Sequence, residues 1–201
     1  MNRPMLVLTG LMVAGISSGV AAQAPGAPKG GRWVVDIVHS QIDFRVSHLL
    51  GRVRGTFTNW YAVIKTDNRG PRSGKVDVTV QTVSLNTGNA MRDADLRAEP
   101  FFAVDSYPEL TFRGTGMSTS DTTTEIVGIL TIKGHTHPAS FKGQFRGVAR
   151  DGEGHERIAF DATTKIDRRD YGMQWTSLVG TNNLVGNEVE ITLALEAVRV
   201  E

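Results

Sequence analysis

Histidine side chains come closest to a catalytic or metal-binding pattern in this chain of 201 residues. His135 and His137 are one residue apart, so a strand would place both imidazoles on one face as half of a metal site. A complete site needs further ligands, and the sequence does not indicate which residues would supply them. A polar turn beside Pro138 is the simpler interpretation, and we expect no metal.

The other candidates for acid–base chemistry are His39 with the neighbouring Ser40, and His48. A base next to a hydroxyl in sequence says little, because a strand sends neighbouring side chains to opposite faces. Residues 23–201 contain neither the Gly-x-Ser-x-Gly pattern of serine hydrolases nor the His-Glu-x-x-His pattern of metalloproteases. A structural role for these histidines is favoured, and a histidine- or metal-dependent hydrolase is kept as the alternative hypothesis.

Apolar side chains in the two longest irregular stretches are more informative. Polar loops do not need them, so they either plug the end of the domain or line the entrance to an apolar cavity, and composition leaves both open. Charged side chains in the same stretches are either solvated or paired in a buried contact. The apolar set is Met91, Phe101, Phe102, Tyr107, Tyr171, Met173 and Trp175, and the charged set is Arg92, Asp93, Arg168, Arg169 and Asp170.

One short helix is predicted, over about residues 88–99. Thr87 or Asn89 would cap its start, because a short polar side chain accepts hydrogen bonds from first-turn N–H groups. Pro100 disfavours helix at the residue before it. The apolar stripe of this helix is weak, so it needs a wall of strands to lie on.

Most of the remaining chain alternates apolar and polar residues, the pattern of half-buried strands. About eight such strands must bury their apolar faces against one another, in a sandwich or in a closed barrel, and the barrel also removes edge strands. A barrel of this size is either just filled by side chains or holds one small ligand. We therefore predict an all-β fold, a single antiparallel β-barrel of about eight strands with the helix near one mouth.

Residues 1–22 have the pattern of a secretory signal peptide, with Arg3, an apolar stretch too short and glycine-rich to span a membrane, and small residues ending at Ala22. Residues 23–31 are rich in Ala, Pro and Gly and are predicted to be a flexible lead-in to one domain, residues 32–201. The leader is bacterial in style, so the expected location is the periplasm or outside the cell. No integral membrane segment is expected after cleavage.

The chain carries 22 Lys and Arg residues against 21 Asp and Glu residues, and the numbers are equal once Arg3 is removed. No block of like charge appears, which argues against nucleic acid as a partner and against a polybasic membrane patch. No cysteine is present, so disulfides and thiolate chemistry are excluded and stability has to come from packing.

Four blocks of residues carry a resemblance to a known family. They are Trp33-x-x-Asp36-x-x-His39-Ser40-x-Ile42-x-Phe44-x-Val46-x-His48 with Gly55-x-Phe57; Ser84-Leu85-x-Thr87 with Arg92-Asp93-x-x-Leu96, Phe101-Phe102 and Tyr107-Pro108-x-Leu110-x-Phe112; Gly128-x-Leu130-Thr131-Ile132-x-Gly134-x-Thr136-x-Pro138; and Asp167-Arg168-x-Asp170-Tyr171-Gly172-Met173 with Gly186. In their order and spacing the chain resembles the YceI-like, polyisoprenoid-binding periplasmic proteins, which have a lipocalin-like barrel.

The resemblance implies a long apolar cavity that holds a polyisoprenoid, isoprenoid quinone or fatty-acyl lipid, in a non-catalytic carrier or storage role without a cofactor. Enclosing such a tail gains about 0.8 kcal/mol per buried methylene. Arg92 or Arg168 is expected to meet a polar or phosphorylated head group. A homodimer is a further expectation. The residues expected at the cavity and its mouth are Phe44, His48, Met91, Arg92, Leu96, Phe101, Phe102, Arg168, Tyr171, Met173 and Trp175.

Overall fold

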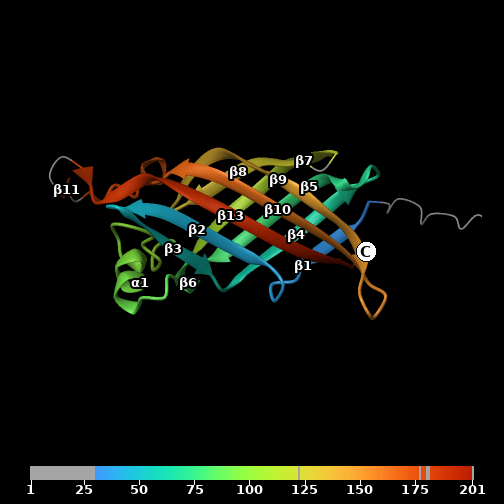
Figure 1. The fold of residues 1–201 in the computed structure, drawn as a ribbon, viewed down its shortest axis with the longest axis horizontal. Coiled ribbons are helices and arrows are strands. Elements are labelled where there is room, and N and C mark those ends of the chain that lie inside the picture. The colour runs from blue at the N-terminus through green and yellow to red at the C-terminus, as the bar shows by residue number, and fades with distance from the viewer. Residues whose placement is uncertain (1–29, 122, 177, 180–181, 201) are drawn as a thin grey trace, which may run out of the picture.

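The computed structural model describes residues 30–121, 123–176, 178–179 and 182–200, and its strands form a closed antiparallel barrel (Figure 1). The ring has the order β1–β4–β5–β7–β8–β9–β10–β13, and β13 pairs with β1 to close it, which confirms the predicted eight-stranded barrel. The proposed signal peptide and residues 23–29 of the lead-in lie outside the described residues. The ring strands are β1 (Arg32–Val35), β4 (Trp60–Asp67), β5 (Gly70–Gln81), β7 (Glu109–Ser120), β8 (Thr123–Ile132), β9 (His135–Arg150), β10 (Glu156–Asp167) and β13 (Val185–Arg199).

Three further strands extend the wall beside β13: β2 (Gln41–His48), β3 (Gly51–Phe57) and β6 (Leu85–Asn86). β2 pairs with the first part of β13, up to Ala194, whereas β1 pairs with its last part, from Ala197. β1 and β2 therefore lie end to end along one edge of β13. β3 pairs with β2 along most of its length, and β6 pairs with β3 only at Thr56 and Phe57.

The helix α1 (Ala90–Arg97) is the one α-helix among the described residues and is shorter than the predicted 88–99. Asn89 caps it, since its side chain accepts a hydrogen bond from the Arg92 N–H at 3.0 Å. The chain is extended at Ala98, two residues before Pro100. In the described part of the chain, no helix combines the length and the apolar composition needed to cross a bilayer.

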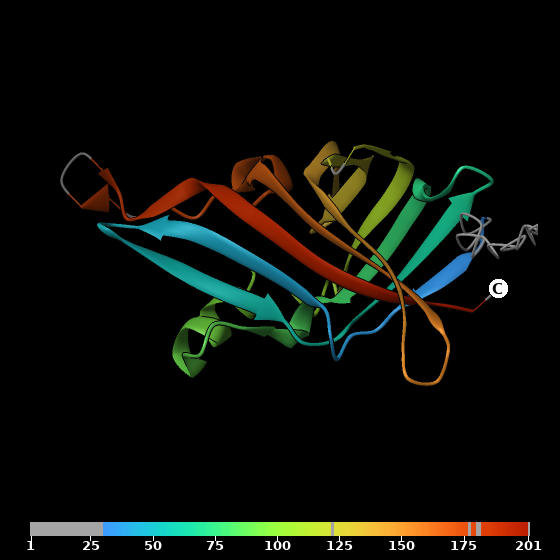
Figure 2. The ribbon, with the colours of Figure 1, turned by 45° about the vertical axis from the view of Figure 1, so that its right-hand side comes forward.

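The remaining elements are short. Two 3-10 turns cover Thr82–Ser84 and Arg168–Tyr171, the second directly after β10. β11 (Leu178–Val179) pairs with β12 (Asn182–Asn183) in a small hairpin just before β13. This hairpin and the turn between β2 and β3 lie at one end of the elongated molecule, and α1 lies in the same half (Figures 1 and 2).

The interior is tightly packed at the end where β1 closes the ring. Trp33, Ile64 and Ile158 are at most 1% exposed, and two of them lie opposite the last residues of β13. Towards the start of β13 the inward side chains Val189 and Ile191 are only partly buried. The barrel is therefore filled by side chains at one end and hollow at the other, whereas the sequence left these as alternatives for the whole interior.

Candidate functional site

An apolar pocket opens into the barrel at the end that carries α1. β8 contributes Leu130 and Ile132 to its lining, β10 contributes Ile166, and β13 contributes Val189 and Ile191. These residues belong to the inward faces of alternating strands, so the pocket continues the hydrophobic core into a region that side chains do not fill.

Aromatic side chains form the wall of this pocket towards α1. Phe57 on β3 packs between Phe44 and Phe102, with ring centroids 5.6 Å and 5.9 Å apart. Phe101 packs on Trp175 with centroids 5.6 Å apart, and this second pair lies further out. Offset and edge-to-face contacts of this kind stabilise aromatic clusters, so the wall is formed before any ligand arrives.

The inner pocket leads into a wider outer pocket, and the two share Phe44, Leu96 and Phe101 among their lining residues. The cavity volume is about 100 Å³ in the inner pocket and about 490 Å³ in the outer pocket. A narrow apolar recess behind a wider opening suits a chain-like group better than a bulky one.

Charged side chains appear only in the outer part of this site, apart from Arg168. His48, Arg92 and Asp95 line the outer pocket. Arg92 donates from Nε to the Thr87 hydroxyl at 2.8 Å and from Nη2 to the Thr87 carbonyl at 3.0 Å. Its Nη1 has no hydrogen-bond partner among the described residues and is available to a group at the mouth.

The position of α1 is fixed by polar contacts to β6 and to the residues on both sides of it. The buried Asp93 carboxylate accepts hydrogen bonds from the N–H of Thr87 at 2.9 Å and from its hydroxyl at 2.5 Å. Arg97 donates to the carbonyls of Val83 and Leu85 at 3.0 Å and 2.7 Å. These contacts hold Leu96, the residue of α1 that reaches both pockets, over the opening.

Arg168 is buried at the inner pocket and holds the chain segment that borders it. Its side chain donates to the carbonyls of Met173 and of Gly186, the latter at 2.9 Å, and to Asn187 Oδ1 at 3.1 Å. Burial lowers the pKa of Arg168 from its usual value, while the nearby Asp167 acts in the opposite direction. Because most of its donors are engaged with the backbone, Arg168 fixes the pocket wall and has little left for a head group.

The structure brings together most of the residues predicted for the cavity and its mouth. It places two elsewhere. Met91 is 79% exposed, because it lies on the face of α1 turned away from the barrel. Tyr171 is buried outside both pockets, with its ring against His137 at a centroid distance of 5.1 Å, and burial raises its pKa to about 12. The predicted residues at the inner pocket are Phe44, Leu96, Phe101, Phe102, Arg168 and Met173, and those at the outer pocket include His48, Arg92 and Trp175.

The strand residues of the pocket, such as Val46, Leu130 and Ile132, were part of the family pattern but were not predicted as cavity residues from the sequence. Alternation marked them as inward-facing, but it does not distinguish the hollow end of a barrel from the filled end. The register of β2 against the first half of β13 would have been needed to place them beside α1.

The histidine pair on β9 does not form a metal site with other described residues. His137 Nε2 lies 3.0 Å from the carbonyl oxygen of Asp170, so it donates a hydrogen bond there. His135 is exposed next to Gly172. Both side chains contact the turn after β10, which supports a structural role at this end of the barrel.

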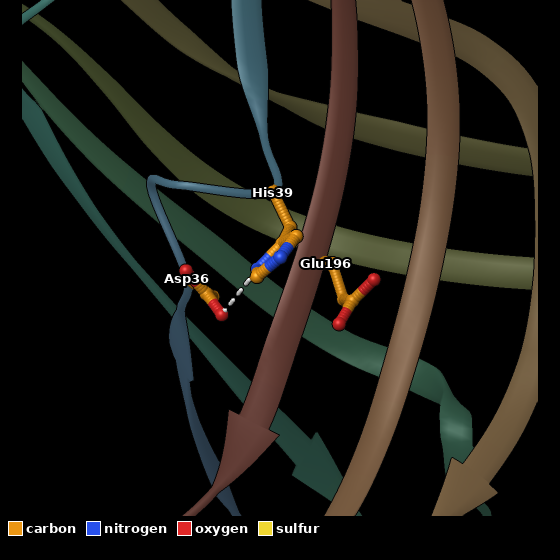
Figure 3. A group of neighbouring side chains, drawn as sticks. All are labelled: Asp36, His39 and Glu196. Carbon is orange, nitrogen blue, oxygen red and sulfur yellow. Dashed lines mark hydrogen bonds and ion pairs between the residues drawn. The ribbon is translucent and has the colours of Figure 1, made fainter. Parts of the chain in front are cut away.

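One group of side chains in the described chain lies close enough to share a metal ion: Asp36, His39 and Glu196 (Figure 3). Arg157 already bridges the two carboxylates of this group, since its Nη1 donates to Asp36 at 3.0 Å and to Glu196 at 2.7 Å. Hydrogen bonds from His39 and then from Arg157 lower the pKa of Asp36 to about 2. A divalent ion would have to displace a guanidinium that matches these carboxylates, so the group is best explained as an ion-pair network.

The hydroxyl of Ser40 is not aimed at His39. It accepts a hydrogen bond from the Glu196 N–H at 2.8 Å and donates to the Glu196 carbonyl at 3.3 Å. Ser40 therefore ties the turn after β1 to β13, and the arrangement of a base activating a hydroxyl nucleophile is not present at these residues.

Fold and site together define an eight-stranded antiparallel barrel with an apolar pocket at the mouth beside a short helix. The YceI-like domain family matches residues 33–197, and the chain belongs to this family. A UPF0312 protein of Pseudomonas savastanoi pv. phaseolicola is 32% identical over 166 residues, which cover 81% of this chain and 86% of that protein.

Solved structures show the same fold. The YCEI protein of Campylobacter jejuni superimposes with a TM-score of 0.67 at 28% identity, over 77% of this chain and 90% of that one. A polyisoprenoid-binding domain from Saccharophagus degradans superimposes with a TM-score of 0.63 at 14% identity, over 84% of this chain and 98% of that one. At that identity the second likeness extends to the fold alone.

Proposed function

We propose that this protein is a non-catalytic carrier that binds the apolar tail of a long-chain lipid in the inner pocket, with the polar end of the lipid at the outer pocket. The observation that carries the proposal is the inner lining, in which every residue but Arg168 is apolar. Burial of a hydrocarbon tail there gains about 0.8 kcal/mol per methylene without requiring a specific polar contact.

An isoprenoid tail is the first candidate, and isoprenoid quinones and fatty-acyl chains are the others. The name of the Saccharophagus degradans domain, which has the same fold, supports the isoprenoid. The small volume of the inner pocket, about 100 Å³, suits part of a linear hydrocarbon chain better than a fused ring system. The described residues that line the inner pocket can distinguish ligands only by the size and shape of the apolar tail, because they offer almost no polar contact to the ligand.

Arg92 is our candidate for the contact with an anionic or hydrogen-bonding head group. It lies at the outer pocket with one guanidinium nitrogen unengaged, whereas the donors of Arg168 are held by backbone carbonyls. A guanidinium matches the oxygens of a phosphate or carboxylate, and the wider outer pocket leaves room for such a group.

The test is native mass spectrometry of the full purified chain, before and after incubation with a polyprenol, an isoprenoid quinone and a long-chain fatty acid. Val189→Trp places a large ring in the inner pocket and should abolish the retained mass of the ligand. Val127→Trp is the matched control, because Val127 is 39% exposed on the same barrel and lies outside the pocket. Equal ligand retention by the two variants, or no ligand of any class on the wild-type chain, would refute the proposal.

Export and assembly belong to the same proposal. Residues 1–22 are proposed to direct the chain to the periplasm and to be removed there, so the intact mass of protein from a periplasmic extract should correspond to a chain that begins at Gln23. A homodimer should appear as twice that mass in light scattering after size exclusion. A full-length mass in the periplasmic extract would contradict cleavage of residues 1–22. A monomer at all concentrations would contradict the homodimer.

A further inference from the structure

The turn between β2 and β3 exposes two leucines to solvent. Leu49 is 54% exposed and Leu50 is 100% exposed. Single exposed apolar residues are ordinary on a protein surface, but two adjacent leucines at the tip of a hairpin form a protruding apolar point. Because nothing in the described chain packs on Leu50, its side chain contributes nothing to the hydrophobic core.

The backbone of this turn makes the leucines harder to explain by folding. His48 pairs with Gly51, so Leu49 and Leu50 form a two-residue hairpin loop. Leu49 has φ of 50°, in the left-handed region that favours glycine. Two-residue hairpin loops usually contain Gly, Asn or Asp at such positions. A leucine is strained there, so the sequence accepts a local cost to keep an apolar side chain at the tip.

This turn lies beside the mouth of the pocket. The residues on its two sides, His48 at the end of β2 and Val53 on β3, both line the outer pocket. The Leu49 N–H donates to the carbonyl of Leu184 at 2.8 Å, which ties the turn to the segment before β13. Figure 1 shows the end of β2, where the turn begins, near the end of the molecule that carries β11 and in the same half as α1.

The hairpin that carries the leucines is locally basic, although the charge of the whole chain is nearly balanced. No acidic residue occurs between Asp43 and Asp67. Arg52 and Arg54 are exposed on β3, and their side chains have no ion-pair or hydrogen-bond partner among the described residues. These cations do not form a continuous block in the sequence, because apolar and small residues separate them.

We propose that the Leu49–Leu50 turn inserts into the surface of an anionic phospholipid layer and that the pocket exchanges its lipid there. This inference rests on the proposed carrier function. The two leucines would leave water for the acyl boundary, and Arg52 and Arg54 would lie at the level of the head groups. A ligand with a long apolar tail would then pass between bilayer and pocket without crossing water.

Vesicle sedimentation of the full chain tests the contact itself and needs no ligand. The probes are phosphatidylcholine vesicles with and without phosphatidylglycerol. Changing both leucines to serine (Leu49→Ser with Leu50→Ser) should weaken the partition onto anionic vesicles by about tenfold or more, since two large apolar side chains are lost. The matched control is Ile37→Ser with Val38→Ser, which removes two exposed apolar residues, 48% and 82% exposed, from the turn between β1 and β2.

Exchange is measured with a fluorescent fatty-acyl probe that moves from loaded protein to vesicles. The rate should rise with vesicle concentration for the wild type and for the control pair, and should become slow and independent of vesicle concentration in the leucine-to-serine pair. Native mass spectrometry of the same variants without vesicles reports whether the pocket still holds the probe. Loss of the probe from the wild type would refute the carrier proposal, whereas normal loading with unchanged sedimentation of the serine pair would refute only the membrane contact.

Leu49→Gly separates the role of the leucine from the fold. Glycine relieves the left-handed strain, so the melting temperature should stay the same or rise, while partition onto anionic vesicles should fall. Equal partition of Leu49→Gly and wild type would overturn the inference. So would a change in molecular mass of the serine pair in size exclusion without a change in sedimentation, because it would assign the turn to contact between two copies of the chain.

Discussion

Replacing Arg168 by alanine should lower the free energy of unfolding by about 2–4 kcal/mol. Arg168 is 3% exposed, and its side chain makes three short hydrogen bonds, to the carbonyls of Met173 and Gly186 and to Asn187 Oδ1, besides a longer one of 3.5 Å to the carbonyl of Val185. Hydrogen bonds from a charged donor contribute roughly 1.5–3 kcal/mol each, so three give an upper bound of roughly 5–9 kcal/mol. Arg168 is buried without a carboxylate in salt-bridge contact, and the desolvation of this cation offsets several kcal/mol of the hydrogen-bond energy. The expected net loss is therefore the smaller value of about 2–4 kcal/mol.

Urea denaturation of Arg168→Ala, followed by tryptophan fluorescence, measures this change. Arg169→Ala is the control, because Arg169 is exposed on the same turn and pairs only with Asp167 among the described residues. An exposed pair of this kind contributes about 0–1 kcal/mol. Arg168→Lys keeps the positive charge but not the planar set of guanidinium donors. The free energy of unfolding that it loses should therefore lie between the losses of the two alanine variants.

The same variant should also bind ligand more weakly, because the backbone that Arg168 holds borders the pocket. Met173 and Val185 line the inner pocket, and their own carbonyls accept hydrogen bonds from Arg168. Without Arg168 this part of the wall would have to become ordered when the ligand binds, and the free-energy cost of that ordering would lower the affinity. If Arg168→Ala and Arg169→Ala lost equal amounts of stability and of ligand, the assignment of Arg168 as the residue that fixes the wall of the inner pocket would be refuted.

Three further predictions concern the two ends of the barrel. Ile64→Ala, at the filled end, should cost about 2–5 kcal/mol in chemical denaturation and leave ligand retention unchanged, since the cavity it creates lies away from the pocket. Asp93→Ala should reduce ligand retention and lower the melting temperature, because the carboxylate that anchors the start of α1 is lost. Hydrogen bonds from His39 and Arg157 lower the pKa of Asp36 from 3.8 to about 2, so its stabilisation is complete above about pH 4 and is lost as pH falls towards 2. Thermal unfolding across this range should show a wild-type advantage over Arg157→Met that shrinks with acidification, and a constant difference would contradict the ion-pair explanation.

The fold was predictable because the alternation of apolar and polar residues along a strand indicates which side chains face inward. The helix was placed correctly by its cap residue Asn89 and by Pro100, although it is shorter than predicted. Closure was harder to foresee. β1 and β2 share one edge of β13, and this depends on pairing between residues more than a hundred positions apart, which no local pattern reports.

The site was predictable where an apolar residue occupies an irregular stretch that has no other use for it. Phe101, Phe102 and Trp175 were found in this way, and all three lie at the pockets. The same argument misplaced Met91 and Tyr171. One lies on the solvent face of its helix, and the other packs on a histidine from β9, and both outcomes depend on tertiary contacts that composition does not contain.

Side-chain volume, rather than pattern, decides where this barrel is hollow. The filled end has large rings facing inward, including Trp33 and Phe160, both at most 1% exposed. At the other end the inward positions of β13 are the smaller Val189 and Ile191, and the rings of Phe44, Phe57 and Phe102 line the pocket without filling it. One strand therefore serves both ends, with its last residues in the rigid core and its first residues along the pocket. Enlarging the inward residues at the start of β13 should extend the core into the pocket, which would add packing while removing the space on which ligand binding depends.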